Sequence, residues 1–332
     1  MASSGSVDFA VTRDNIIQSV LEDLGVMSPG ETTSSASFTD HSAGLAIKLN
    51  AIIKQLGNPT DGSPGMQVWA QKIAYLFLQT NQSVYTLGPT TTETGATNKW
   101  ASAYVTTTVG TAAVANDSTV VLAATAASVG ISSTMRIGIE LDSGAMFWTT
   151  VNGAPSGSTV TLTTNITGAA AVGNRIFSYA TTAQGRRPLE IRTAVLRDTD
   201  GNDTPLSAIS LEAYEYGVPK KNQDSTPQQL YYKPTLTDGT LYLDCEPTDV
   251  TDVIRIVGRS PFEDFDAAGD NPDFDQHWIR PLIHCLTVDA LPRFGQEARA
   301  PFFIKLREES LAIARNFFPE TSDAYFQPGD SA

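Results

Sequence analysis

Apolar residues recur at helical spacing in the first part of the chain. The first such segment lies between Thr12 and Gly25. Its apolar positions are Ile16, Ile17, Val20, Leu21 and Leu24. A threonine before such a run is typical of a helix N-cap, and a glycine after it is typical of a helix end. A second segment repeats the pattern between Asp40 and Gly57, so we predict two helices, capped by Thr12 and Asp40.

The same period returns in three later segments. One follows "GNPTDGSPG" and places Trp69, Ile73, Leu76 and Phe77 on one face. Residues 274–318 contain two more apolar stripes. The first stripe comprises Trp278, Leu282, Leu286 and Ala290, and the second comprises Phe302, Phe303, Leu306, Ile313 and Phe317. Because no segment is apolar on all sides, we predict amphipathic helices that share one core.

Between about residues 89 and 183 the chain is rich in Thr, Ala, Ser and Gly and poor in charge. Short β-type runs recur there, separated by glycine-containing turns. They are residues 104–109, 118–124, 135–141, 145–151, 158–164 and 174–180. This pattern predicts an inserted all-β sandwich or small barrel domain over residues 89–183.

Strand-like alternation continues after residue 184. It covers residues 189–197, 228–234, 240–247 and 252–260, with "TDGT" (237–240) as a hairpin turn. The predicted fold class is therefore α+β: a helical bundle body with an antiparallel β-sheet region, plus the inserted β-domain. Residues 1–88 form the N-terminal helical part of this body, residues 184–318 complete it, and residues 319–332 are an extended tail.

Composition narrows the class of protein. The 332 residues carry a formal net charge of −14, and the pI is near 4.6. Such acidity argues against a nucleic-acid groove built from Lys and Arg, although it would let DNA pass without retention. Cys245 and Cys285 lack metal or redox spacing and are expected to be reduced thiols. No signal peptide or membrane span is recognisable, so we expect a soluble intracellular product.

The segment "DAAGDNPDFDQHW" (266–278) raises the question of chemistry because it concentrates four aspartates and a histidine. Its spacing does not fit a calcium loop, and the histidines of the chain are not spaced for zinc. Asparagine before proline, or aspartate three residues before glutamine, fits a helix start instead. We favour this interpretation over a metal site or an acid catalyst. The predicted helix entrance comprises Asn271, Pro272, Asp273, Asp275 and Trp278.

Other catalytic signatures are missing from the sequence. It has no G-x-S-x-G, no P-loop and no G-x-G-x-x-G, and neither cysteine has a local catalytic pattern. His41, His277 and His284 are expected to be surface or packed residues. We therefore expect no enzyme activity, no cofactor and no metal.

Two aromatic features suggest binding. Trp148 and Tyr179 in the β-domain are candidates for stacking on a sugar ring. Alternation along the strand, however, places Phe147 and Trp148 on opposite faces, so one of them is expected in the core. Near the C-terminus, Tyr325 and Phe326 lie in a segment that cannot build its own core, and such aromatics usually need a host surface.

Several segments together carry a resemblance to a known family. In order they are "VTRDNIIQSVLEDLGVMSPGE", "RPLEIRTAVLRDTDGNDTPLSAIS", "TPQQLYYKPTLTDGTLYL", "RSPFEDFDAAGDNPDFDQHWIRPLIHCLTVDALPRFG" and "SDAYFQP". This order resembles the head-to-tail adaptors (tail accessory factors) of short-tailed bacteriophages over most of residues 10–88 and 184–328. The element "FEDFD…DNPDFDQHW" is the most specific part. Residues 144–180 also resemble a β-module inserted in larger members of that group.

The resemblance implies a virion structural protein made in the bacterial cytoplasm. Copies would form a ring, typically of twelve, beneath the portal protein, where they extend the DNA channel, close the filled head and attach a downstream tail or nozzle protein. It implies that the C-terminal residues Tyr325, Phe326, Gln327 and Pro328 dock on the portal, and that DNA passes without sequence-specific binding. The alternative function is a tail-associated glycan-binding or glycan-hydrolysing protein that acts through the β-insert.

Overall fold

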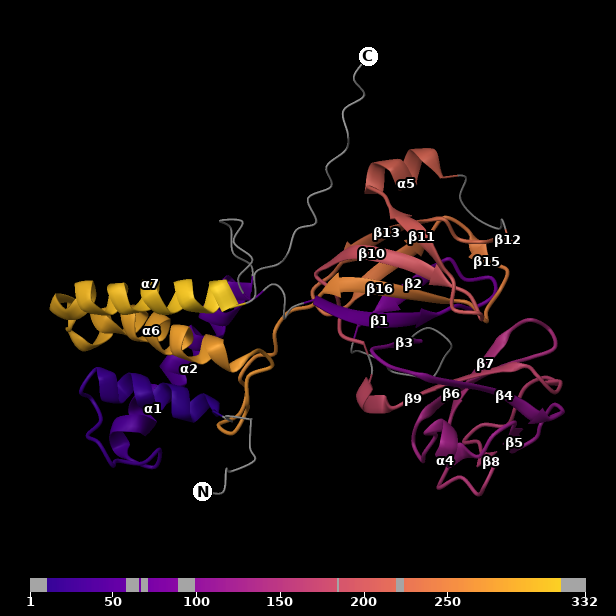
Figure 1. Ribbon diagram of the computed structural model, residues 1–332, viewed down its shortest axis with the longest axis horizontal. Coiled ribbons are helices and arrows are strands. Elements are labelled where there is room, and N and C mark those ends of the chain that lie inside the picture. Colours follow the sequence, from indigo (N-terminus) through magenta and orange to yellow (C-terminus); the bar gives the residue numbers. More distant parts are fainter. Residues whose placement is uncertain are drawn as a thin grey trace, which may run out of the picture. The chain divides into compact units, whose positions relative to one another are not determined.

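The chain divides into two compact units. The computed structural model describes residues 11–57, 66, 71–88, 99–183, 185–218 and 224–317 (Figure 1). One unit, here called the helical unit, comes from Met1–Ala70 together with Pro261–Ala332. The other, the β unit, is the continuous segment Gln71–Ser260. Both ends of the chain therefore contribute to the same unit.

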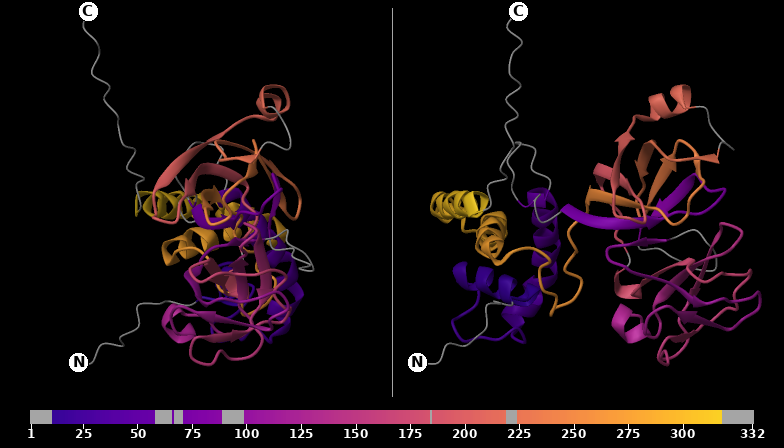
Figure 2. Two further views of the ribbon diagram at one scale, coloured as in Figure 1. Left: turned by 90° about the vertical axis from the view of Figure 1, so that its right-hand side faces the viewer. Right: turned by 45° about the vertical axis from the view of Figure 1, so that its right-hand side comes forward.

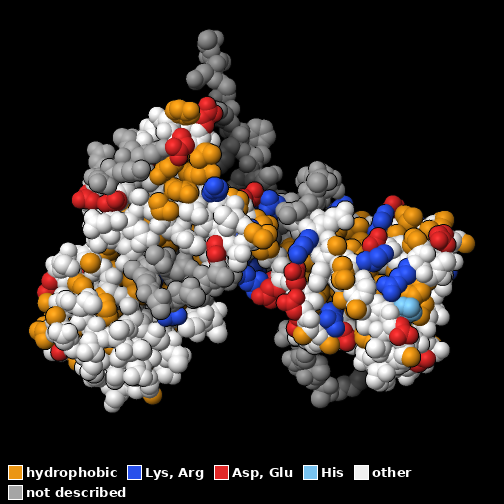
Figure 3. Space-filling model, turned by 180° about the vertical axis from the view of Figure 1, so that it is seen from behind, with side chains coloured by type: hydrophobic (Ala, Val, Ile, Leu, Met, Phe, Trp, Pro, Cys, Tyr) orange, Lys and Arg blue, Asp and Glu red, His pale blue; other side chains and the backbone are white. Residues whose placement is uncertain are grey.

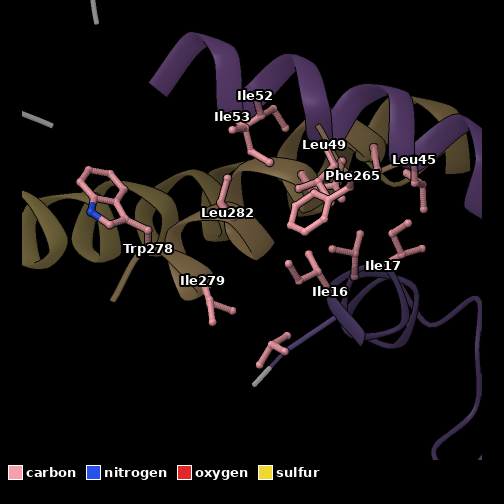
Figure 4. Close-up of a cluster of buried hydrophobic side chains, with 14 of the residues drawn as sticks. Ile16, Ile17, Leu45, Leu49, Ile52, Ile53, Phe265, Trp278, Ile279 and Leu282 are labelled. Carbon is pink, nitrogen blue, oxygen red and sulfur yellow. The ribbon is translucent and has the colours of Figure 1, made fainter. Parts of the chain in front are cut away.

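Four α-helices surround one core in the helical unit. They are α1 (Arg13–Asp23), α2 (Ala36–Gly57), α6 (Ile279–Ala290) and α7 (Ala300–Phe317). Short 3₁₀ turns are η2 (Gln276–Trp278), η3 (Leu291–Phe294) and η4 (Glu297–Arg299). Figure 4 shows side chains from α1, α2 and α6 meeting around Phe265. Burying each large aliphatic side chain stabilises the fold by roughly 1.5–3 kcal/mol.

The helix boundaries test the predicted caps. The Thr12 side chain accepts a hydrogen bond from the Asn15 backbone, and the Asn15 side chain bonds back to Thr12, so the cap of α1 is confirmed. Gly25 adopts a φ of 69°, as expected where the helix stops. The predicted cap at Asp40 is wrong, because α2 begins at Ala36 and Ser35 Oγ accepts from Phe38 N at 3.2 Å.

An eight-stranded sheet dominates the β unit, in the order β2-β14-β13-β11-β10-β16-β1-β3. All neighbouring pairs are antiparallel except β11 and β13. The strands form a curved sheet in both views of Figure 2. Leucines, isoleucines, Tyr85 and Trp100 make up its core. The strands are β1 (Gln71–Phe77), β2 (Val84–Leu87), β3 (Trp100–Ala101), β10 (Glu190–Arg197), β11 (Asp203–Ala208), β13 (Gln229–Pro234), β14 (Gly239–Leu243) and β16 (Val253–Arg259). The short pair β12 (Asp224–Ser225) and β15 (Glu246–Pro247) and the helix α5 (Leu211–Gly217) accompany them.

The middle part of the β unit's sequence forms a six-stranded sheet, in the order β7-β6-β9-β4-β5-β8. A bridge between Val151 and Leu162, and a 2.9 Å bond from Thr163 N to Thr150 O, join its two end strands, so the sheet nearly closes into a barrel. All six strands predicted between residues 104 and 180 are confirmed. They are β4 (Val105–Thr111), β5 (Thr119–Leu122), β6 (Arg136–Glu140), β7 (Met146–Thr150), β8 (Thr159–Thr161) and β9 (Arg175–Tyr179), with α4 (Ala126–Val129) and η1 (Thr181–Ala183) beside them.

The expected α+β fold with a helical bundle body is wrong. The protein is mostly β, built on sheets of eight and six strands, and the four long helices form a unit of their own. The largest local error is the helix expected over Trp69–Phe77. Residues 71–77 are instead the strand β1, which pairs with β16 on one side and β3 on the other. Trp69 lies outside the described residues.

Candidate functional site

The acidic segment 262–278 begins the second chain segment of the helical unit. Its backbone is tied to α1 by hydrogen bonds from Arg13 N to Asp270 O at 3.0 Å and from Asp14 N to Ala268 O at 3.4 Å. Asp270 Oδ2 also accepts from Ala267 N at 2.6 Å, which closes a turn. The two ties to α1 are thus made by backbone carbonyls, and the Asp270 carboxylate fixes only the turn beside them.

Aromatic residues alternate with the acidic ones in this segment and point into the core. Phe262, Phe265, Phe274 and Trp278 are all buried in the core of the helical unit. The rings of Phe262 and Phe274 meet edge to face, with centroids 5.8 Å apart. The amide of Asn50 on α2 bonds the backbone of Phe265, accepting from its N at 2.9 Å. The motif therefore anchors the helical unit through its aromatics and its backbone.

The entrance to α6 is capped later than predicted. The cap is Asp275, at the start of the turn η2 that leads into α6, rather than Asn271 or Asp273. Asp275 Oδ1 accepts from His277 N at 2.9 Å and also contacts the His277 ring. Asp273 Oδ2 instead accepts from Glu263 N at 3.3 Å. Burial alone would raise the pKa of Asp275, but its hydrogen bonds from His277 and the charge of that ring outweigh burial and lower it.

The other polar candidates are scattered. His41 packs edge to face on Phe294, His277 bonds Asp275, and His284 lies between α6 and α7, where it contacts Leu306 O and Ser310 Oγ. Among the described residues, no three His, Cys, Asp or Glu side chains gather in a way that fits a metal ion. Burial raises the pKa of both thiols, to about 12 for Cys245 and about 11 for Cys285.

The two residues proposed for sugar stacking are used in packing. Tyr179 is 2 % exposed, and its ring stacks on Phe77 with centroids 5.7 Å apart. The Trp148 ring lies against Gly138, where a Cβ would come within 2.7 Å of ring atoms, and the Lys99 ammonium lies 5.1 Å from its centroid. Tyr179 therefore offers no open face to a sugar, whereas Trp148 is half-buried. Phe147 packs against the barrel core and Trp148 packs on the outside, as the alternation predicted.

A hollow of about 610 Å³ adjoins Trp148 on the six-stranded part. Threonines of β7 and of residues 163–167 line it together with Lys99 and Arg136. In Figure 3 this part of the β unit, at the lower left, presents few charged side chains. The hollow is lined by apolar side chains as well as threonines, it carries two cationic side chains, and no carboxylate stands among its described lining residues.

Sequence reasoning missed one cluster of carboxyl groups in the β unit. Asp252, at the start of β16, is half-buried, and burial together with the charges of Asp249 and Asp198 raises its pKa to about 6. Asp249 and Asp252 are close in the sequence, in "DVTD" (249–252), but Asp198 is distant from both. The sequence therefore did not indicate that the three carboxyl groups lie near one another. The raised pKa is that of Asp252, the half-buried member of the three.

The predicted docking residues Tyr325, Phe326, Gln327 and Pro328 lie outside the described residues. Within the described ranges, no helix combines the length and apolar character that crossing a bilayer demands. No protein family matches the chain. No curated protein matches it either.

Proposed function

We propose that this chain is a virion structural protein: a head-to-tail adaptor that forms a ring beneath the portal, extends the DNA channel, closes the packaged head and attaches the tail. The observation that carries the proposal is the organisation of segment 262–278. The part of the sequence that most specifically resembles adaptors uses its aromatics as core, and its Asp270, Asp273 and Asp275 carboxylates accept hydrogen bonds from backbone N–H groups of the same segment. Residues employed in this way suit a scaffold that assembles with partners.

The surface of the helical unit supports contacts with neighbouring copies. Ile47 on α2 is 73 % exposed, and Phe302 and Ile313 on α7 are 60 % and 66 % exposed. Large apolar side chains on helices that already have a core are candidates for burial against another chain. In a ring, each such contact is repeated at every junction, so weak contacts add as avidity.

The net charge of −14 supports a channel component that DNA crosses without being retained. The tail residues Tyr325 and Phe326 would supply the contact with the portal. Burying both rings in a cleft would provide roughly 3–6 kcal/mol per copy before the cost of ordering the tail.

The test is to mix the purified protein with the portal ring of the same phage and to weigh the complex by native mass spectrometry. The full chain is compared with a chain lacking residues 320–332, with the double variant Tyr325→Ala and Phe326→Ala, and with a chain lacking only residues 329–332. The last is the matched control, because it shortens the tail but keeps the aromatic residues.

We expect the full chain and the control to form a complex of ring stoichiometry, and the other two to lose it. If the full chain does not bind the portal at all, the adaptor proposal is wrong. In that case host glycans would be screened against residues 71–260.

A further inference from the structure

A turn of the six-stranded sheet contains the only asparagine of the chain that is followed by glycine, Asn152–Gly153. The turn lies between β7 and β8, and both residues are exposed. Gly153 has a φ of 73°, and a Cβ added to it would meet nothing within 4 Å. The space beside this glycine is therefore open.

The two groups that can react with each other here are the side-chain amide of Asn152 and the backbone N–H of Gly153. Within the described parts of the chain, neither group has a hydrogen-bond partner. The backbone N–H of Asn152, in contrast, donates to Thr161 O at 2.8 Å. The residue is thus fixed through its own backbone, while its side chain can rotate towards the next backbone nitrogen.

Other asparagines of the β unit differ in these contacts. The side chain of Asn174 donates to Glu140 O at 3.1 Å, and the following N–H, that of Arg175, donates to Glu140 Oε2 at 2.7 Å. The side chain of Asn202 donates to Asp198 Oδ2 at 2.8 Å. Such a bond must break before the amide can be attacked, which slows the reaction by about 2- to 12-fold for each hydrogen bond. No bond of this kind to a described residue protects Asn152.

We propose that Asn152 is a site of spontaneous deamidation, and that its isoaspartate product weakens the contact between β7 and β8. The backbone nitrogen of Gly153 loses its proton to hydroxide and attacks Cγ of Asn152. The bond from Cγ to the side-chain nitrogen breaks, and that nitrogen takes a proton from water and leaves as ammonia. Glycine hinders this attack least because it has no Cβ. Water then opens the succinimide ring at either carbonyl and gives aspartate or isoaspartate, each with one more negative charge than asparagine.

The place of the turn gives the isoaspartate product its effect. Val151 forms a bridge with Leu162, and Thr163 N donates to Thr150 O at 2.9 Å, so these contacts join β7 to β8. In isoaspartate the backbone runs through Cβ and becomes one carbon longer directly after them. The longer chain changes the path of a turn that sets the register of the two strands. Ordinary aspartate leaves the backbone as it is.

The first test follows the folded full chain in mildly alkaline buffer over several days. Digestion and peptide mass spectrometry measure the conversion at each asparagine, and the synthetic peptide TTVNGAPSG (149–157) is the reference for an unrestrained asparagine. We expect Asn152 to convert at no less than about one tenth of its rate in the peptide, and faster than every other described asparagine. A slower conversion than this would show that the fold protects Asn152 and would overturn the proposal.

Two matched variants locate the reaction. Asn152→Gln keeps an amide at the turn but would need a larger ring, so it should abolish the conversion there. Asn202→Gln is the control, because the side chain of Asn202 is already bonded to Asp198. It should gain negative charge as fast as the parent chain in ion-exchange chromatography. If Asn152→Gln also gains charge at the parent rate, deamidation occurs elsewhere and the proposal is wrong.

The second test concerns the product. Ion-exchange chromatography separates the deamidated chain, and a methyltransferase specific for isoaspartate identifies the isoaspartate form. Asn152→Asp is its matched reference, because it carries the same charge on an ordinary backbone. Amide hydrogen exchange in β7 and β8 should be at least about 2-fold faster in the isoaspartate form. Equal exchange in the two would contradict the proposed effect on the strands. Neither test needs a portal or a virion, so both are independent of the adaptor proposal.

Discussion

The pKa values of Asp252 and Asp275 are shifted in opposite directions by their surroundings. Burial and two neighbouring carboxylates raise the pKa of Asp252 to about 6. At Asp275 burial also raises the pKa, but hydrogen bonds from His277 prevail and lower it. Asp275 therefore helps the fold in its charged form, whereas Asp252 helps it in its protonated form.

The surroundings of Asp252 lead to a prediction on pH and stability. Its folded pKa of about 6 lies above the ordinary value of 3.8, so its contribution is complete below about pH 4 and is lost as the pH rises through 6. Asp252→Asn should raise the free energy of unfolding at pH 7.5 by about 1 kcal/mol, a value reduced for solvent screening of this half-buried group. The gain should shrink towards pH 4. Urea unfolding at several pH values measures it.

Asp200→Asn is the control for this measurement, because it also removes one negative charge but from an exposed turn nearby. A gain of equal size at pH 4 and pH 7.5, or a gain shared by both variants, would contradict the account.

At the scale of elements, β1 explains why sequence periodicity failed where it did. Ala74 and Leu76 face the core of the eight-stranded sheet, while Phe77 and Tyr75 belong to a second cluster shared with the six-stranded part. Because both faces of the strand are covered, the alternation that marks a strand is hidden, and Ile73, Leu76 and Phe77 fit helical spacing by chance. The strands with clear alternation or β-branched runs were predicted correctly.

The helix α7 shows the same limit in finer detail. Its buried residues are Phe303, Ser310 and Ala314, whereas Phe302 and Ile313 of the predicted apolar stripe are exposed. Hydrophobicity alone does not separate a core position from a position available to another chain. The contact of the Tyr214, Tyr231 and Tyr242 rings could not be predicted for a different reason, since Tyr214 joins the other two only through the placement of α5. The pairing of Tyr231 with Tyr242 could have been predicted, because "QLYYKP" and "TLYLD" flank one hairpin turn.

The packing of α6 on α7 gives a second prediction on pH. His284 contacts Leu306 O and Ser310 Oγ on α7, and it faces Arg280 on its own helix and Asp23 at the end of α1. Burial, the largest cause, lowers its pKa below 6.5, so its contribution to stability is complete above that value and is lost as the pH falls below it. His284→Gln should flatten the loss of thermal stability between pH 7.5 and pH 5.

The control for His284 is His41→Gln, the same substitution at a histidine that packs on Phe294. The measurement is the melting temperature, followed by circular dichroism between pH 7.5 and pH 5. If the melting temperature of His284→Gln falls with pH as steeply as that of the parent protein, His284 does not have this role.

At the scale of the molecule, the order of the chain determines which parts can fold alone. The helical unit uses both ends, and α1 and α2 bury their apolar faces largely against α6 and the segment before it. The β unit is continuous, and its two sheets share a cluster that joins Phe77, Phe177 and Tyr179 with Val250 and Val253. The six-stranded sheet therefore shares a buried core with the eight-stranded sheet and is not a separate domain.

This arrangement predicts that residues 71–260 fold alone and residues 1–70 do not. The continuous segment contains the complete cores of both sheets, so it should give a cooperative thermal transition and a dispersed amide spectrum. Residues 1–70 lack α6 and α7, so they should remain largely unstructured. Joining 11–57 to 261–317 through about eight Gly and Ser residues should restore helical circular dichroism and cooperative melting. If 71–260 alone melts without cooperativity, the two units depend on each other for stability, and the division at residues 70 and 261 does not describe how the chain folds.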